Sequence, residues 1–171
     1  LVLVVLFQTD IRNALAQIGI FTLFRENSQQ KRDVVESILQ ACLVMSQQRI
    51  GALIVLEQEV GLKNFSDRGT QINATVSEPL LLSIFLPTSP LHDGAVIISN
   101  KGDLLAAQCI LPVSMNSALS SSLGTRHRAA IGLTEETDAA VLIVSEERKE
   151  ISLSFRGQLI RGKNEDIRKA L

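Results

Sequence analysis

Short, continuous apolar runs constrain the fold of this chain more than any other feature of its sequence. The clearest run is Ala52-Leu53-Ile54-Val55-Leu56, and a second extends from Ala139 to Val144. Runs this short, without polar alternation, are typical of strands that are covered on both faces. A sheet that contains such strands needs helices on either side, so the sequence favours a layered α/β domain.

Helical periodicity and turn residues place further elements before and between these strands. The pattern predicts, in chain order, a short helix after Thr9 and Asp10, a longer helix with Val34 to Met45 along one face, a loop over Lys63 to Asn73, and a helix over Glu78 to Leu86 capped by Ser77. Strands over Ala95 to Ser99 and Leu104 to Leu111 then flank Asn100-Lys101-Gly102-Asp103, which is a hairpin signal.

The last third of the chain continues the alternation. A Ser-rich loop from Ser114 to Ser122 precedes a short helix that we expect over Arg126 to Gly132. Further on, Ile151, Leu153 and Phe155 alternate with two serines, which predicts a half-exposed strand that turns at Arg156-Gly157. Together these elements predict a single α/β domain with a central mixed β-sheet flanked by helices.

Composition narrows the class of protein. A chain of 171 residues with a formal net charge of -1 builds one core and lacks the basic excess of a non-specific nucleic-acid binder, so we expect no nucleic-acid partner. Cys42 and Cys109 lie in apolar runs without metal-binding spacing, and we expect both to be buried free thiols. The apolar start, Leu1 to Phe7, is far shorter than the roughly 20 residues that a membrane helix needs.

The first polar cluster is Leu91-His92-Asp93-Gly94-Ala95, between a double-proline turn and an apolar strand. Gly94 and Ala95 allow another molecule to approach the backbone closely. A carboxylate such as Asp93 at a strand entrance can bind a divalent metal or accept a proton from a hydroxyl. The alternative is a plain turn made by Asp93 and Gly94.

The second cluster is Gly124-Thr125-Arg126-His127-Arg128. Thr125 is a candidate helix cap, and helix N-termini favour anions. Arg126 and Arg128 diverge if the segment is helical, whereas in an extended turn they can converge on one polyphosphate. The alternatives are a solvated basic turn and, for His127, a structural hydrogen bond.

The third cluster, Ser145-Glu146-Glu147, follows the second apolar strand, where a hydroxyl can meet a phosphate and a carboxylate a metal. Such a charged run is also typical of a solvated loop. The sequence contains no P-loop, dinucleotide-binding glycine motif, nucleophile elbow or HExxH motif. From the residues alone, the prediction stops at a phosphate and metal pocket.

Taken together, the clusters resemble the diadenylate cyclase family. The resemblance runs through 51–57, 90–98, 123–130 and 144–147 and covers about Phe7 to Ile160. The pair Asp93-Gly94-Ala95 and Arg126-His127-Arg128 is its most specific part. The family implies a twisted mixed sheet and an enzyme that condenses two ATP molecules into cyclic di-AMP and two pyrophosphates. It also implies Mg²⁺ or Mn²⁺ and two sites facing each other in a homodimer.

The resemblance also implies roles for individual residues. Asp93 would act on the 3′-hydroxyl as metal ligand or base, beside Gly94 and Ala95, where the ribose lies close. The implied phosphate-binding residues are Thr125, Arg126, His127, Arg128 and Ser145, and the implied metal ligands are His92, Asp93 and Glu147. The adenine would lie near Leu53, the backbone of Leu111, and Ile110, where some relatives have a tyrosine.

The start of the chain most resembles the membrane-anchored type of the family. On this interpretation 1–8 is a remnant of the linker after a removed anchor, 9–161 is the catalytic domain and 162–171 a flexible tail, with the full-length protein on the cytoplasmic face of the bacterial membrane. Two other functions stay open. A non-catalytic ATP or cyclic-dinucleotide sensor needs the arginines more than Asp93, and a metal-dependent phosphohydrolase usually gathers more ligands than two histidines allow.

Overall fold

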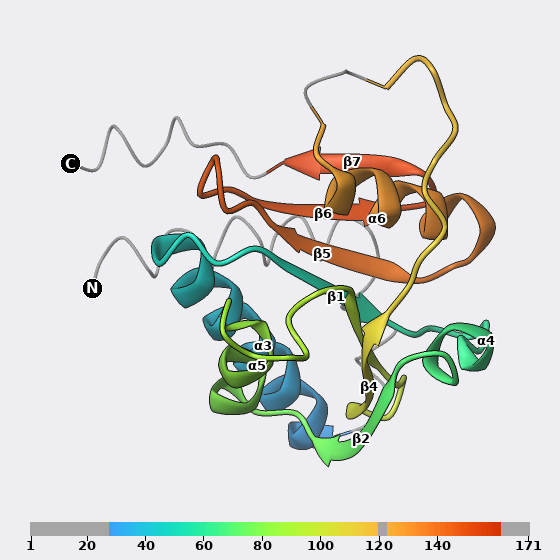
Figure 1. Ribbon diagram of the computed structural model, residues 1–171. Helices are drawn as coiled ribbons and strands as arrows, with labels where there is room; N and C mark the ends of the chain where they lie inside the picture. Colours follow the sequence, from blue (N-terminus) through green and yellow to red (C-terminus); the bar gives the residue numbers. More distant parts are fainter. Residues whose placement is uncertain (1–27, 120–122, 162–171) are drawn as a thin grey trace.

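The described part of the chain forms one mixed sheet with helices on both faces (Figure 1). The computed structural model describes residues 28–119 and 123–161. Within these residues the elements are α3 (Ser28–Gln47), β1 (Ala52–Leu56), α4 (Lys63–Ser66), β2 (Thr70–Thr75), α5 (Glu78–Phe85), β3 (Ala95–Ile98), β4 (Asp103–Cys109), α6 (Thr125–Glu136), β5 (Ala140–Val144), β6 (Ile151–Phe155) and β7 (Gln158–Arg161). The strand order is β2-β4-β3-β1-β5-β6-β7, which confirms the predicted fold class.

The central strand β1 explains the continuous apolar run of the sequence. It pairs in parallel with β3 and antiparallel with β5, while the other pairs of the sheet are antiparallel. Ile54 and Leu56 belong to the apolar cluster on the side of α3 and α5. Leu53 and Val55 belong to the cluster on the side of α6. Both faces of β1 are therefore buried, and a strand in that position has no place for polar residues.

One helix extends beyond its apolar face, and the prediction of one segment as a loop was wrong. Helix α3 begins at Ser28, inside the polar stretch that precedes the apolar face, so packing of its C-terminal half carries a polar first turn. The segment predicted as a loop, Lys63 to Asn73, holds α4 and most of β2. Strand β2 lies at the edge of the sheet, pairs only with β4 and stays largely exposed, so its residues lack the apolar alternation that marks a strand.

The prediction of a half-exposed strand over β6 was also wrong. Ser152 and Ser154 are 2% and 0% exposed, because α6 covers this face of the strand. The hydroxyl groups of Thr134 and Ser154 share a hydrogen bond of 2.8 Å, and the Thr134 Oγ1 also accepts from the Gly157 amide. A serine face can therefore be buried here because the covering helix supplies a hydroxyl partner for one of its two serines.

Several predictions were confirmed. Ser77 accepts a hydrogen bond from the Leu80 amide at the start of α5, and β3 and β4 form the predicted antiparallel hairpin. Cys42 and Cys109 are buried and free. Among the residues that the structure describes, no helix is long and apolar enough to cross a bilayer. The short helix expected after Thr9 and the tail from 162 lie outside the described residues.

Candidate functional site

The first and third polar clusters lie at the same end of the central strands. Strand β5 runs antiparallel to β1, with Ala52 opposite Val144, so β5 ends where β1 begins. Strand β3 runs parallel to β1, with Ile54 opposite Val96, which sets Gly94 level with the same end. Neighbouring strands are about 4.8 Å apart, so roughly 10 Å separates the backbones of these clusters across β1. That span is within reach of a single nucleotide.

The second cluster forms the N-terminal turn of α6. The helix runs from Thr125 to Glu136, beyond the predicted end at Gly132. The N-cap is Gly124, with extended backbone, and Thr125 is the first helical residue, so the prediction of Thr125 as cap was wrong. A glycine cap leaves the first amides of the helix without a side-chain acceptor from their own turn, and these amides favour an anion.

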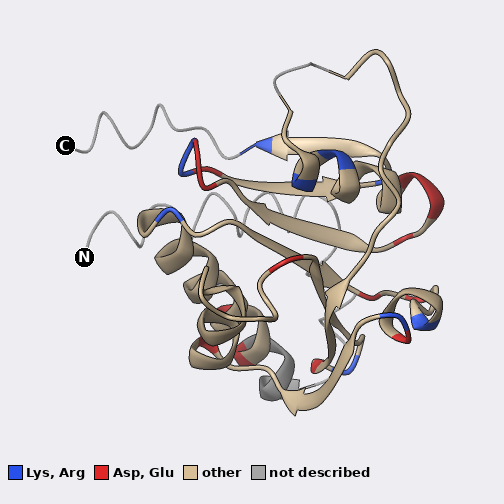
Figure 2. Ribbon diagram, viewed as in Figure 1, with Lys and Arg blue, Asp and Glu red and all other residues tan. Residues whose placement is uncertain are grey.

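This helix start and the turn between β5 and β6 enclose an open pocket. Its lining residues are Gly124, Thr125, Arg126, His127, Val144, Ser145, Glu146, Glu147 and Arg148. Arg126 Nη1 lies 3.3 Å from Glu146 Oε2, which joins the two walls. Figure 2 shows basic residues at the start of α6 and charges of both signs on the turn. The predicted residues Thr125, Arg126, His127, Ser145 and Glu147 thus line one polar pocket.

Arg128 does not line this pocket. The segment is helical, so residues two apart point in divergent directions, and Arg126 and Arg128 do not converge as they would in an extended turn. The backbone of Arg128 instead holds the segment after β4, since its carbonyl oxygen accepts from the Ser114 amide at 3.0 Å.

Three arginines act electrostatically on the buried side chain of His127. Burial lowers the pKa of His127 below its ordinary value of 6.5, and the positive charges of Arg161, Arg148 and Arg126 lower it further. These guanidinium groups come from β7, from the turn after β5 and from α6. Sequence reasoning missed Arg148 and Arg161, because only the pairing of β6 with β5 and β7 brings them to this helix. The electrostatics favour a neutral His127 and an anionic ligand.

Two side-chain hydrogen bonds hold the segment just before Asp93 in place. The ring Nδ1 of His92 donates to the Ser89 carbonyl oxygen at 2.6 Å, and the side chain of Gln108 donates to the Pro90 carbonyl oxygen at 2.6 Å. Gly94 has φ +107°, and a Cβ there would lie 2.8 Å from the carbonyl carbon of Gln108. The exposed Asp93 is therefore followed by a position whose backbone conformation and close contacts require glycine. Gln108 carries no motif that would have marked it in the sequence.

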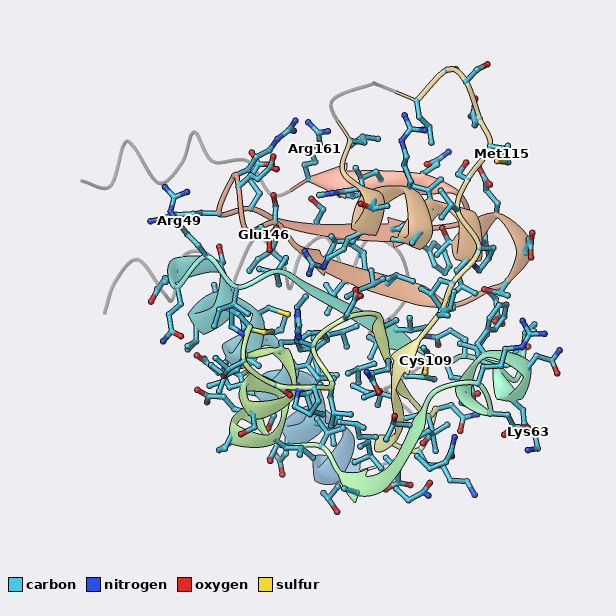
Figure 3. The ribbon with its side chains drawn as sticks, in the orientation of Figure 1. Arg49, Lys63, Cys109, Met115, Glu146 and Arg161 are labelled. Atoms are coloured by element: carbon cyan, nitrogen blue, oxygen red, sulfur yellow. The ribbon has the colours of Figure 1, made fainter. Side chains whose placement is uncertain are left out.

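The three predicted adenine neighbours differ in exposure. Leu53 and Leu111 are buried in the same apolar cluster beneath α6, so their side chains are not open to a ligand. Ile110, directly after β4, is 76% exposed. Further along this segment Met115 is 93% exposed, and Figure 3 shows it pointing away from the sheet. Of the three, only the side chain of Ile110 is free to pack on a base.

The predicted metal ligands lie on two separate segments. His92 and Asp93 precede β3, whereas Glu147 lies on the turn after β5, on the other side of β1. Within 28–119 and 123–161, no three His, Cys, Asp or Glu side chains gather closely enough to hold a metal ion. The protein by itself therefore offers an incomplete ligand set in its described part.

The chain resembles diadenylate cyclases in sequence. Residues 39–159 match the family described as DisA bacterial checkpoint controller nucleotide-binding (DAC). Cyclic di-AMP synthase CdaA of Bacillus subtilis is 41% identical over 177 residues, which cover 100% of this chain and 64% of that protein. A diadenylate cyclase of Listeria monocytogenes is 40% identical over 170 residues, which cover 97% and 62%. The chain thus spans less than two thirds of the length of these curated relatives.

Solved structures agree with this assignment. A double mutant of DacA from Staphylococcus aureus matches with a TM-score of 0.77 and 42% identity, over 84% of this chain and 95% of that one. A hypothetical membrane spanning protein from Bacillus cereus matches with a TM-score of 0.72 and 43% identity, over 75% and 63%. Fold and similarity together define an α/β domain of a family described as nucleotide-binding. The chain belongs to the diadenylate cyclase (DAC) family.

Proposed function

We propose that this domain condenses two ATP molecules into cyclic di-AMP and two pyrophosphates. The observation that carries the proposal is the polar pocket at the start of α6, which Arg126, His127 and Arg148 line, in a chain of the diadenylate cyclase family. Phosphoryl transfer depends mainly on positioning and charge neutralisation, so such a pocket can serve it without a covalent nucleophile.

In this scheme the pocket holds the phosphates. The guanidinium of Arg126 donates hydrogen bonds to the phosphate oxygens. Thr125 and the first amides of α6 donate further hydrogen bonds, and the Ser145 hydroxyl donates one from the opposite wall of the pocket. His127 lies buried behind them and orders the turn. The base packs on the exposed Ile110, against the strand end that carries Leu111. An aliphatic side chain there gives up the aromatic stacking of a tyrosine, worth about 0.5–1.5 kcal/mol.

Asp93 is the residue proposed to handle the proton. Its carboxylate accepts the proton of the 3′-hydroxyl, and the freed oxygen forms a bond to the α-phosphorus of the other ATP. The bond between the α-phosphorus and the bridging oxygen breaks, and pyrophosphate leaves with that oxygen. A second, equivalent step closes the ring. Gly94 and Ala95 add no bulk beside Asp93, so a ribose can approach the backbone there.

A divalent metal fits this site as a shared ion. Mg²⁺ is usually held by one or two carboxylates together with substrate phosphates, and Mn²⁺ accepts similar ligands. Asp93 would supply a carboxylate, and His92 would supply Nε2, since its Nδ1 already donates to a carbonyl in the manner of ligating histidines. Glu147 would take part from the opposite segment. The ion would neutralise charge that develops on the phosphates.

We further propose that catalysis takes place in a homodimer. One chain presents one phosphate pocket, and each ATP must meet the α-phosphorus of a second one, so two protomers have to face each other across their sites. The full-length protein is proposed to act at the cytoplasmic face of the bacterial membrane. The hypothetical membrane spanning protein from Bacillus cereus, 43% identical to this chain, supports the attachment.

Product analysis tests the proposal directly. The protein is incubated with ATP and Mn²⁺, and the products are separated by chromatography. Cyclic di-AMP together with pyrophosphate is the expected result. ADP or AMP without cyclic product would instead establish a phosphohydrolase, and unchanged ATP with measurable binding would establish a sensor.

Asp93→Asn tests the role of the carboxylate. The substitution keeps the size of the side chain and removes its basicity, so we expect turnover to be lost while ATP binding stays within about tenfold. Asp67→Asn is the matched control, because Asp67 pairs with Lys63 on the exposed α4 and should leave turnover unchanged. Near-normal turnover of Asp93→Asn would remove Asp93 from the mechanism.

A further inference from the structure

Gly51 lies directly before β1, between the two walls of the phosphate pocket, and is buried. A Cβ built on it would lie 2.7 Å from Arg126 Cζ and 2.8 Å from Glu146 Oε2, and closer still to Arg126 Nη1. Real Cβ atoms essentially never approach other heavy atoms within 3.0 Å. The guanidinium of Arg126 and the carboxylate of Glu146 therefore occupy the space that any other residue at this position would fill.

Backbone conformation does not explain this glycine. The described glycines with left-handed φ values are Gly94, Gly102 and Gly157, and Gly51 is not among them. Alanine can thus adopt the backbone conformation of position 51. What the position requires is the absence of a side chain.

The ion pair above Gly51 is too weak to fix the guanidinium by itself. The side chains of Arg126 and Glu146 are 31% and 55% exposed, and a single contact of 3.3 Å between partly exposed groups contributes little. The shape of the surrounding backbone must therefore help to fix the position of the Arg126 guanidinium. The open space over Gly51 lets the guanidinium of Arg126 lie close to the backbone there.

The turn that carries Glu146 is held in place by the end of a second element. This turn is bound to the end of α3, where Ser46 Oγ donates to the Lys149 carbonyl oxygen at 2.7 Å and Arg49 Nη1 reaches the Glu147 carbonyl oxygen at 3.5 Å. Figure 3 shows Arg49 at this end of α3, on the same side of the molecule as Glu146. The turn, the start of β1 and the start of α6 thus meet around one guanidinium.

We propose that Gly51 is a positioning residue for phosphate recognition, whose missing side chain leaves the slot that sets where the Arg126 guanidinium stands. The inference rests on the proposed function, in which Arg126 holds a phosphate. All three atoms that a Cβ would strike belong to the ends of flexible side chains, so Gly51→Ala can fold while displacing the guanidinium. The expected result is ATP binding weakened roughly tenfold to hundredfold, the range of one charged hydrogen-bonding group.

A double-mutant cycle separates this role from a general structural effect. ATP dissociation constants are measured for the wild type, Gly51→Ala, Arg126→Ala and the double variant. If Gly51 acts through Arg126, the substitution at 51 weakens binding in the wild type but has no further effect once Arg126 is alanine. Equal effects in both backgrounds would overturn the inference. Gly61→Ala is the control, since a Cβ at exposed Gly61 meets no atom within 4 Å.

A second measurement needs no nucleotide and so stands apart from the proposed function. In protein with isotope-labelled arginine, the Nε–Hε signal of Arg126, assigned through Arg126→Lys, should shift in Gly51→Ala and stay unchanged in Gly61→Ala. An unmoved signal would refute the slot, whatever the protein does with ATP. If the signal moves in Gly51→Ala but the wild type fails to bind ATP, the slot is kept and the proposed function is overturned.

Discussion

Helix α6 packs closely against the segment that follows β4, and Gly132 is the residue that permits this contact. A Cβ on Gly132 would lie 2.7 Å from the Ser114 amide nitrogen and 2.9 Å from the Pro112 carbonyl carbon, and closer still to the Pro112 carbonyl oxygen. These are backbone atoms, which cannot rotate away as a side-chain end can. In Gly132→Ala the helix and the segment must move apart by more than the ~0.7 Å that would bring the 2.7 Å approach to the ordinary 3.4 Å, because the Pro112 carbonyl oxygen lies closer still.

The cost of Gly132→Ala follows from this movement. The hydrogen bond from the Ser114 amide to the Arg128 carbonyl, 3.0 Å long, would stretch beyond its useful range and give up about 1 kcal/mol. Overpacking adds about 1–3 kcal/mol, and the better helix propensity of alanine returns about 1 kcal/mol. We therefore expect Gly132→Ala to lower the free energy of unfolding by about 1–3 kcal/mol. Each 1 kcal/mol corresponds to a decrease in Tm of about 2–4 °C in a chain of this size.

Urea unfolding followed by circular dichroism measures this change, with Gly61→Ala as the matched control. The control adds the same methyl group where nothing lies within 4 Å, so its stability should stay within about 0.5 kcal/mol of the wild type. Gly132→Ala as stable as the wild type, or more stable, would refute the reasoning. That result would mean that the helix and the segment after β4 are not in close contact.

Two further predictions concern titratable groups. Burial and three arginines hold the pKa of His127 below 6.5, so the folded protein resists a proton that the unfolded chain accepts. The free-energy cost of this difference is absent well above pH 6.5 and destabilises the fold increasingly as the pH falls below 6.5. Unfolding at about pH 5.5 and about pH 7.5 should show the wild type losing more stability than His127→Gln on acidification, and equal losses would contradict this origin. Burial also raises the pKa of Cys42 to about 12 and that of Cys109 to about 11, so neither thiol should react with iodoacetamide in the folded protein at about pH 8. Both should react after denaturation, and rapid labelling of the native protein would show that one of them is accessible.

Much of the core could be predicted from the sequence, because apolar patterning reports burial directly. The runs at β1 and β5, the capped helix α5 and the β3–β4 hairpin were all predicted near their observed bounds. Patterning failed where an element is exposed or where a neighbour changes its environment. Edge strand β2 has no apolar face to reveal it, and the serines of β6 are buried only because α6 lies over them.

The sequence by itself determined the buried strands, the polar clusters between them and, through resemblance, the family. Tertiary structure alone decided which clusters meet. Parallel pairing of β1 with β3 and antiparallel pairing of β1 with β5 bring Asp93 and Ser145 to one edge, and helix formation turns Arg128 away from Arg126. Arg148 and Arg161 join His127 for the same reason. Local propensity acts on neighbours in sequence, whereas a site is assembled by strand register and helix packing between residues far apart in the chain.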